Sequence, residues 1–167
     1  MSQRKPADIV EFKKDANRIV LLAESALLGS LMLDARAFGK VRRLVSEADF
    51  IEPKHRFIFR AVVHLQQRGA LADVIAVADF LEERGHKQFI DLAYLGMMAK
   101  DTPSAANVMT YARIVKKHAL MRKGLKLVRH YAHLLQHPGE YEVTDIINQL
   151  SNAAFVLQQE AESAHDD

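Results

Sequence analysis

Three histidines in the last third of the chain have the spacing of metal ligands. His130, His133 and His137 lie three and four residues apart, which would place their imidazoles on one face of a helix. Metal sites usually add a carboxylate or a thiolate, but the chain has no cysteine and residues 102–139 contain no acidic residue. We therefore expect adventitious binding of nickel or zinc at most, and no functional metal site.

Other residue types that could do chemistry lack the arrangement that catalysis needs. Glu82 and Glu83 are adjacent, and adjacent helical residues point about 100° apart, so their carboxylates do not converge. The Gly-Lys pair at residues 39–40 is followed by Val41, and Asp34 stands where a phosphate-binding loop needs its first glycine. We predict no catalytic residue, no nucleotide site and no cofactor for this chain.

Charge is segregated near the C-terminus. Residues 102–139 carry seven Lys or Arg and no acid, whereas residues 140–167 carry seven acids and no Lys or Arg. A basic helix face could follow the phosphates of DNA, with an affinity that falls as salt rises. The acidic segment or a partner chain could also neutralise it, and we favour this second interpretation. The candidate contacts with DNA or a partner are Lys116, Lys117, Lys123, Lys126 and Arg129.

The basic residues lie in a segment that predicts one long helix. Pro103 suits a first helical position behind a capping Thr102, and the next strong break is Pro138-Gly139, so we expect a helix over residues 103–136. Its apolar residues form two stripes, of which one can pack on the chain's own body and the other needs a partner. An amphipathic helix after the break would pack antiparallel to it. The predicted interface residues of this hairpin are Val108, Tyr111, Val115, Leu125, Val128, Ala132, Leu135, Ile146, Ile147, Leu150 and Leu157.

The preceding residues predict a compact head of about five short helices. Helical periodicity and turn residues place these helices at about residues 18–34, 36–45, 53–68, 74–84 and 87–99. Gly29 would permit the close approach of a neighbouring helix, and His55 is expected to be a structural hydrogen-bonding residue. We predict an all-α fold with a projecting antiparallel helical hairpin. The expected divisions are a flexible tail (1–17), the head (18–101), the hairpin (102–160) and the start of a linker or a disordered terminus (161–167).

Composition indicates where such a chain would work. A chain of 167 residues can bury a core without disulfides, and the lack of cysteine fits a reducing compartment. The apolar run at residues 19–33 is interrupted by Glu24, and the mixed charges before it do not fit a signal peptide. We expect a soluble cytoplasmic protein that does not associate with a membrane.

Five groups of residues occur in an order and spacing that together point to one family. They are AESALLGSLMLD (23–34), DF with PKHR and IF (49–59), AYL (93–95), TPSAAN (102–107) and YARIV (111–115). Over residues 18–160 they resemble the N-terminal domain of bacterial DnaB-type replicative DNA helicases. The chain departs from the family at Ile51, where an aromatic residue is usual, at residues 89–92, which lack the usual glycine pair, and at residues 17–22, which lack a proline and an acid. The departures indicate a divergent member, such as one from a phage, a plasmid or an integrated element.

The resemblance implies a non-catalytic collar domain. In this family heads and hairpins associate into dimers, three dimers form a collar above the motor ring, and the collar docks primase and loading factors. The implied partners are a second copy of the chain, primase and a helicase loader, with DNA reached through the assembled ring. ATP and Mg²⁺ belong to the family's separate motor domain.

Two other functions stay open at this point. The chain could be a free-standing relative that modulates a host helicase or primase through the same surfaces. It could also be a DNA-binding module that uses the basic helix at residues 113–129.

Overall fold

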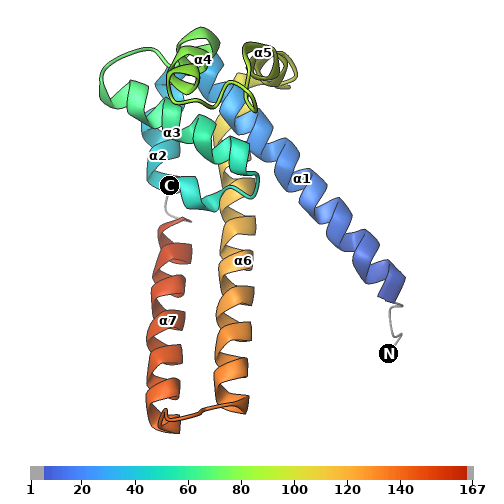
Figure 1. Cartoon of the computed structure of the whole chain (residues 1–167), viewed down its shortest axis with the longest axis vertical. Helices are drawn as coiled ribbons and strands as arrows, with labels where there is room; N and C mark the ends of the chain where they lie inside the picture. The colour runs from blue at the N-terminus through green and yellow to red at the C-terminus, as the bar shows by residue number, and fades with distance from the viewer. Residues whose placement is uncertain (1–5, 165–167) are drawn as a thin grey trace. The chain divides into compact units, whose positions relative to one another are not determined.

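The computed structural model describes the backbone of residues 6–164 and the side chains of residues 17–164. The described residues form helices and turns without a strand, which confirms the all-α prediction. The α-helices are α1 (Pro6–Leu33), α2 (Phe38–Leu44), α3 (Pro53–Gln67), α4 (Val74–Glu83), α5 (Leu92–Lys100), α6 (Val108–Gln136) and α7 (Val143–Ser163) (Figure 1). Short 3₁₀ turns lie at Ala35–Ala37, Glu47–Asp49 and Ala105–Asn107.

The chain divides into two compact units within helix α6. Unit 1 ends at Val115 and unit 2 begins at Lys116, so the first residues of α6 belong to unit 1 and the rest to unit 2. The sequence had suggested a division after residue 101, at the turn before the long helix. Buried side chains explain the later position, since Val108, Ala112 and Val115 are part of the core.

Helix α1 is the central element of unit 1. It contacts both α3 and α5, and α4 packs against α3 and α5 in turn. Leu27, Leu28 and Leu31 of α1 are fully buried, as are Ile58 of α3 and Leu95 of α5. Because a buried aliphatic side chain contributes about 1.5–3 kcal/mol, this cluster accounts for much of the stability of the unit.

Gly29 allows α1 to approach α5 closely, as the sequence predicted. A Cβ atom at this position would lie 2.0 Å from the Thr102 Oγ1 and 2.7 Å from the Met98 carbonyl oxygen. The Thr102 hydroxyl itself donates a hydrogen bond to the Met98 carbonyl, at 2.9 Å. The end of α5 is therefore fixed against the one residue of α1 that has no side chain.

Three predicted helix starts differ from the structure. The long helix begins at Val108, not at residue 103, because the Thr102 hydroxyl bonds back to α5 and does not cap a new helix. The fifth helix begins at Leu92, where the Asp91 carboxylate accepts a hydrogen bond from the Tyr94 backbone amide. Helix α1 begins at Pro6, so it includes most of the segment expected as a flexible tail, and residues 1–5 of that segment lie outside the described residues. Pro6 suits a helix start because its missing N–H has no helical acceptor there.

Unit 2 is the predicted antiparallel hairpin. Its two helices, the later part of α6 and all of α7, run side by side in opposite directions (Figure 1). The turn between them contains Pro138, whose carbonyl accepts from the Tyr141 amide at 3.0 Å, and Gly139, which has a φ of 60°. Such a left-handed conformation favours glycine, so this turn depends on the residue type at position 139.

Candidate interaction surfaces

An uncovered apolar face lies on unit 2. Leu125 and Val128 of α6 are 54% and 62% exposed, and Ile147 of α7 is 51% exposed. The apolar residues of this face are Met121, Leu125, Val128, Ala132 and Leu135 on α6, with Val143, Ile147 and Ala154 on α7. Their spacings of three, four or seven residues keep each row on one side of its helix. Because the helices are antiparallel, the two rows fall on the same side of the hairpin, beside the contact between the helices.

A partly buried charge cluster fixes the register of this hairpin. The Lys116 ammonium donates a hydrogen bond to Glu160 Oε1 at 2.6 Å, and Lys123 donates to the same oxygen. Only 8% of the Lys116 surface is exposed. Burial raises the pKa of Glu160, but hydrogen bonds and charge from the two lysines outweigh it and hold the pKa below its ordinary value. The carboxylate is therefore ionised at neutral pH and joins the two helices.

Apolar contacts continue the same helix-to-helix seam. Ile146 is buried near the start of α7, and the nearest atom to a Cβ built on Gly124 would be the Leu157 Cδ2, at 3.6 Å. Leu150 and Leu157 are half-buried. Of the predicted interface residues on α7, Ile146 is thus directed inward, whereas Ile147 lies on the uncovered face.

The predicted stripe along α6 is divided between two environments. Val108 and Val115 are buried and Tyr111 is half-buried in unit 1, whereas Leu125, Val128, Ala132 and Leu135 are exposed in unit 2. The structure does not bring these seven residues into one surface. The candidate self-association surface is consequently limited to the unit 2 part of the stripe and its neighbours on α7.

The predicted basic contacts are also of two kinds. Lys116 and Lys123 are paired with Glu160, whereas Lys117, Lys126 and Arg129 are exposed. Partial burial, with the charges of Lys117 and Arg122, lowers the pKa of His118. For Lys116 and Lys123 the acidic helix supplies the neutralising charge that the sequence indicated.

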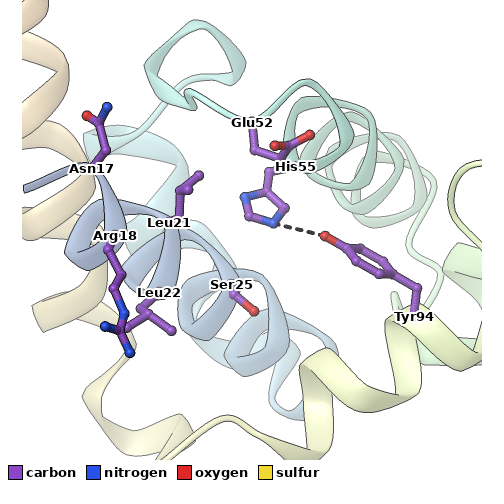
Figure 2. A pocket seen from close by; sticks show the side chains of 8 residues that line it. All are labelled: Asn17, Arg18, Leu21, Leu22, Ser25, Glu52, His55 and Tyr94. Carbon is purple, nitrogen blue, oxygen red and sulfur yellow. Dashed lines mark hydrogen bonds between the residues drawn. The ribbon is translucent and has the colours of Figure 1, made fainter. Parts of the chain in front are cut away.

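A hydrogen-bond network in unit 1 joins the family-like motifs. The Glu24 carboxylate is fully buried and accepts from the Ile51 amide at 2.6 Å, from the Glu52 amide at 3.3 Å and from His55 Nδ1 at 2.7 Å. On the other side of the ring, His55 Nε2 lies 3.3 Å from the Tyr94 hydroxyl. Figure 2 marks this hydrogen bond with a dashed line. Burial, followed by the charges of Glu52 and Glu24, raises the pKa of Tyr94. The network ties α1, the start of α3 and α5 together, which is the structural role expected for His55.

A shallow pocket of about 470 Å³ opens beside this network. Arg18, Leu21, Leu22 and Ser25 of α1 form one side of it, and the other side is formed by Glu52, His55 and Tyr94 (Figure 2). The role of Glu24 was not predicted from the sequence, where it interrupts an apolar run and forms part of the first family-like motif. The signal was present, since an acid within a buried helix needs a hydrogen-bonding partner and His55 follows a proline at the start of another helix.

The histidines at the end of α6 do not form a metal centre in the described residues. The rings of His133 and His137 lie 5.1 Å apart, and His130 packs edge-on against Tyr131. Within residues whose side chains are described, no three His, Cys, Asp or Glu groups are placed to share an ion. None of the described helices is long and apolar enough to span a membrane.

Comparison with known proteins gives consistent matches. A sequence model of the family described as "DnaB-like helicase N terminal domain" matches residues 17–117. The replicative DNA helicase DnaB of Buchnera aphidicola is 38% identical over 108 residues, which cover 64% of this chain and 23% of that protein. The DnaB of Pasteurella multocida is 26% identical over 147 residues, which cover 87% of this chain and 32% of that protein. The chain thus spans about a quarter to a third of the length of these curated relatives.

The fold has a solved counterpart. The crystal structure of the N-terminal domain of DnaB helicase from Mycobacterium tuberculosis matches with a TM-score of 0.75 and 27% sequence identity. The match covers 81% of this chain and 96% of the other. Both comparisons therefore point to the same domain, by sequence and by fold.

Proposed function

Because this chain belongs to the DnaB-like helicase N-terminal domain family, we propose that it is a non-catalytic collar domain that works by self-association and by docking primase and loading factors. The proposed assembly unit is a dimer of two copies, which in a full ring would be repeated as a trimer of dimers. The unwinding and ATP hydrolysis of the family are assigned to a motor domain of the assembled helicase. No cofactor is assigned to the residues of this chain.

The observation that carries the proposal is the uncovered apolar face of unit 2. Leu125, Val128 and Ile147 are each more than half exposed, although helices in a monomer normally direct such residues inward. Burying one such side chain contributes about 1.5–3 kcal/mol, while association costs about 4–15 kcal/mol. Several of these residues must therefore be buried together, which a second hairpin with the same face would achieve by two-fold symmetry.

The charge cluster supports the same proposal. Glu160 holds Lys116 and Lys123 between the helices of one chain, so these charges are not left on the apolar face. A fixed register also limits the entropy that would be lost on association. The face is therefore preorganised for a symmetrical partner.

Sedimentation velocity of the chain tests the proposal. We expect a reversible dimer at high micromolar concentration, and a monomer when Leu125→Glu and Val128→Glu are combined, with helical content unchanged by circular dichroism. Lys126→Glu is the matched control, because it changes the net charge by the same amount from another side of α6. A strict monomer in the wild-type chain, with the hairpin folded, would contradict the proposal.

A further inference from the structure

A second apolar surface lies in unit 1, on the side of α4 that does not face the core. Val77, Phe80 and Leu81 of α4 are buried, whereas Ile75 is 71% exposed. Residues 75, 78, 79 and 82 repeat at helical spacing and line a pocket with residues 87 and 90–92. Helix α4 thus has apolar residues, Ile75 and Ala78, outside the core as well as within it, beside the acids Asp79 and Glu82.

This pocket is lined by both apolar and charged residues and can admit a large apolar side chain. Its volume is about 320 Å³, and it lies between α4 and the start of α5, which contact one another. Ile90 is buried, Ala78 is half-buried, and Leu92 is 55% exposed. The volume is at the lower end of the range of about 300–1,000 Å³ for ligand pockets, so it has room for a leucine, methionine or phenylalanine side chain together with part of the peptide that carries it.

Both helices that frame the pocket have fixed starts. Asp73 accepts hydrogen bonds from the Ile75 and Ala76 amides at 3.0 and 2.8 Å. Asp91 accepts from the Tyr94 amide at 2.8 Å. Because capping residues of this type stabilise a helix start by about 1 kcal/mol, the opening is held by local structure and does not need a ligand to form.

The rim of the pocket is acidic. Asp79, Glu82 and Asp91 line it, against one basic residue, Lys87, which is paired with Glu82. An excess of negative charge disfavours nucleic acid and anionic lipid headgroups, since both present phosphates. The same negative charge attracts lysine and arginine side chains of a partner. Exposed ion pairs between such side chains and the rim mainly determine which partner binds.

We propose that this pocket docks a cationic peptide segment of a partner protein, which inserts one large apolar side chain between α4 and α5. The inserted side chain covers Ile75 and Leu92, and flanking lysines or arginines lie against Asp79 and Glu82. The surface shares no residue with the hairpin face, so this proposal stands or falls independently of self-association.

A labelled peptide provides the test. We choose fluorescein-Lys-Lys-Ala-Phe-Ala-Lys-Lys, titrated with the full chain and followed by fluorescence anisotropy. Ile75→Ser should weaken binding by roughly 5- to 10-fold, because it removes apolar contact from an exposed position that the core does not need. Asp79→Asn combined with Glu82→Gln should weaken binding by roughly 3- to 10-fold and reduce its dependence on salt.

Matched controls separate a built site from general attraction. Glu83→Gln removes one charge from the same helix outside the pocket and should change affinity by less than about twofold. A second peptide has alanine in place of the phenylalanine. Its affinity for the wild-type protein should be as low as the affinity of the phenylalanine peptide for the Ile75→Ser variant. The proposal would be overturned if Glu83→Gln weakened binding as much as the Asp79→Asn/Glu82→Gln variant does. It would also be overturned if the alanine peptide bound the wild-type protein as tightly as the phenylalanine peptide.

The other occupant of such a pocket would be a second copy of the chain. Sedimentation of the Asp79→Asn/Glu82→Gln variant distinguishes the two cases. We expect its self-association to match that of the wild type. If the variant instead loses self-association and the peptide does not bind, the pocket is an interface between copies and the proposal is wrong.

Discussion

Replacing Gly29 with alanine should destabilise unit 1, although alanine is the better helix former. The added Cβ would lie 2.0 Å from the Thr102 Oγ1 and 2.7 Å from the Met98 carbonyl oxygen, and both distances are much shorter than a van der Waals contact. Overpacking of this kind costs about 1–3 kcal/mol, and displacing the Thr102 hydroxyl costs about 0.5–1.5 kcal/mol through its hydrogen bond to Met98. The better helix propensity of alanine offsets about 1 kcal/mol of these costs, so we expect a net loss of about 0.5–3.5 kcal/mol.

Urea unfolding followed by circular dichroism measures this loss. Thermal unfolding should show a decrease of roughly 1–14 °C in midpoint, at about 2–4 °C per kcal/mol for a chain of this size. Gly96→Ala in α5 is the control, because a Cβ at that position would meet nothing within 4 Å. There the same substitution should stabilise the protein by about 0.4–1 kcal/mol.

A double variant tests the cause. Combining Gly29→Ala with Thr102→Ala removes the atom at 2.0 Å but leaves the backbone carbonyl at 2.7 Å. The double variant should therefore lose less stability than the sum of the two single variants. If Gly29→Ala is as stable as the wild type, the close contact between α1 and α5 does not constrain this position and the reasoning is refuted.

Two further predictions concern unit 2. Because the pKa of Glu160 lies below its ordinary value of 4.5, its ion pairs stabilise the hairpin above that pH and are lost as pH falls through the lowered pKa. Glu160→Gln should therefore lower the melting temperature at neutral pH but make little difference in acid, and an equal effect at both pH values would contradict this. The exposed Lys117, Lys126 and Arg129 are the candidate contacts with single-stranded DNA. If these three residues make the contacts, the slope of log affinity against log salt should be no steeper than about −2, because each neutralised phosphate contributes roughly 0.7. The salt dependence should disappear when all three residues are replaced by Glu. A steeper slope that survives the triple substitution would show that other cations bind the phosphates.

Local signals in the sequence were enough to predict the class of fold and the hairpin. Apolar spacing identified the helices, and Pro138-Gly139 marked the turn between α6 and α7. The need for a small residue at position 29 was also predicted, because a glycine within a helical pattern indicates close packing. The predicted start of α6 was wrong because the Thr102 hydroxyl can either cap a new helix or donate a hydrogen bond to the preceding helix. The sequence does not indicate which of these two hydrogen bonds is more stable.

Side-chain partners across long sequence separations were harder to predict. The opposite charges of residues 102–139 and 140–167 indicated that lysines on one helix would meet acids on the other. They did not indicate that one carboxylate, Glu160, would take both Lys116 and Lys123. Likewise, the buried position of Glu24 depends on Ile51, Glu52 and His55, which are brought to it only when α1 packs against the start of α3.

The ion pairs of Glu160 also explain how a hairpin can keep an apolar face uncovered in one chain. Apolar contact alone would permit α7 to rotate around α6 and cover Leu125 and Val128 with its own apolar residues. Rotation would break the hydrogen bond from Lys116 to Glu160, and breaking an ion pair of a largely buried lysine costs more than breaking an exposed one. The Leu157 contact at Gly124 opposes the same rotation, because it needs that side of α7 to face α6. Polar pairing inside the hairpin therefore keeps the apolar residues available to a partner.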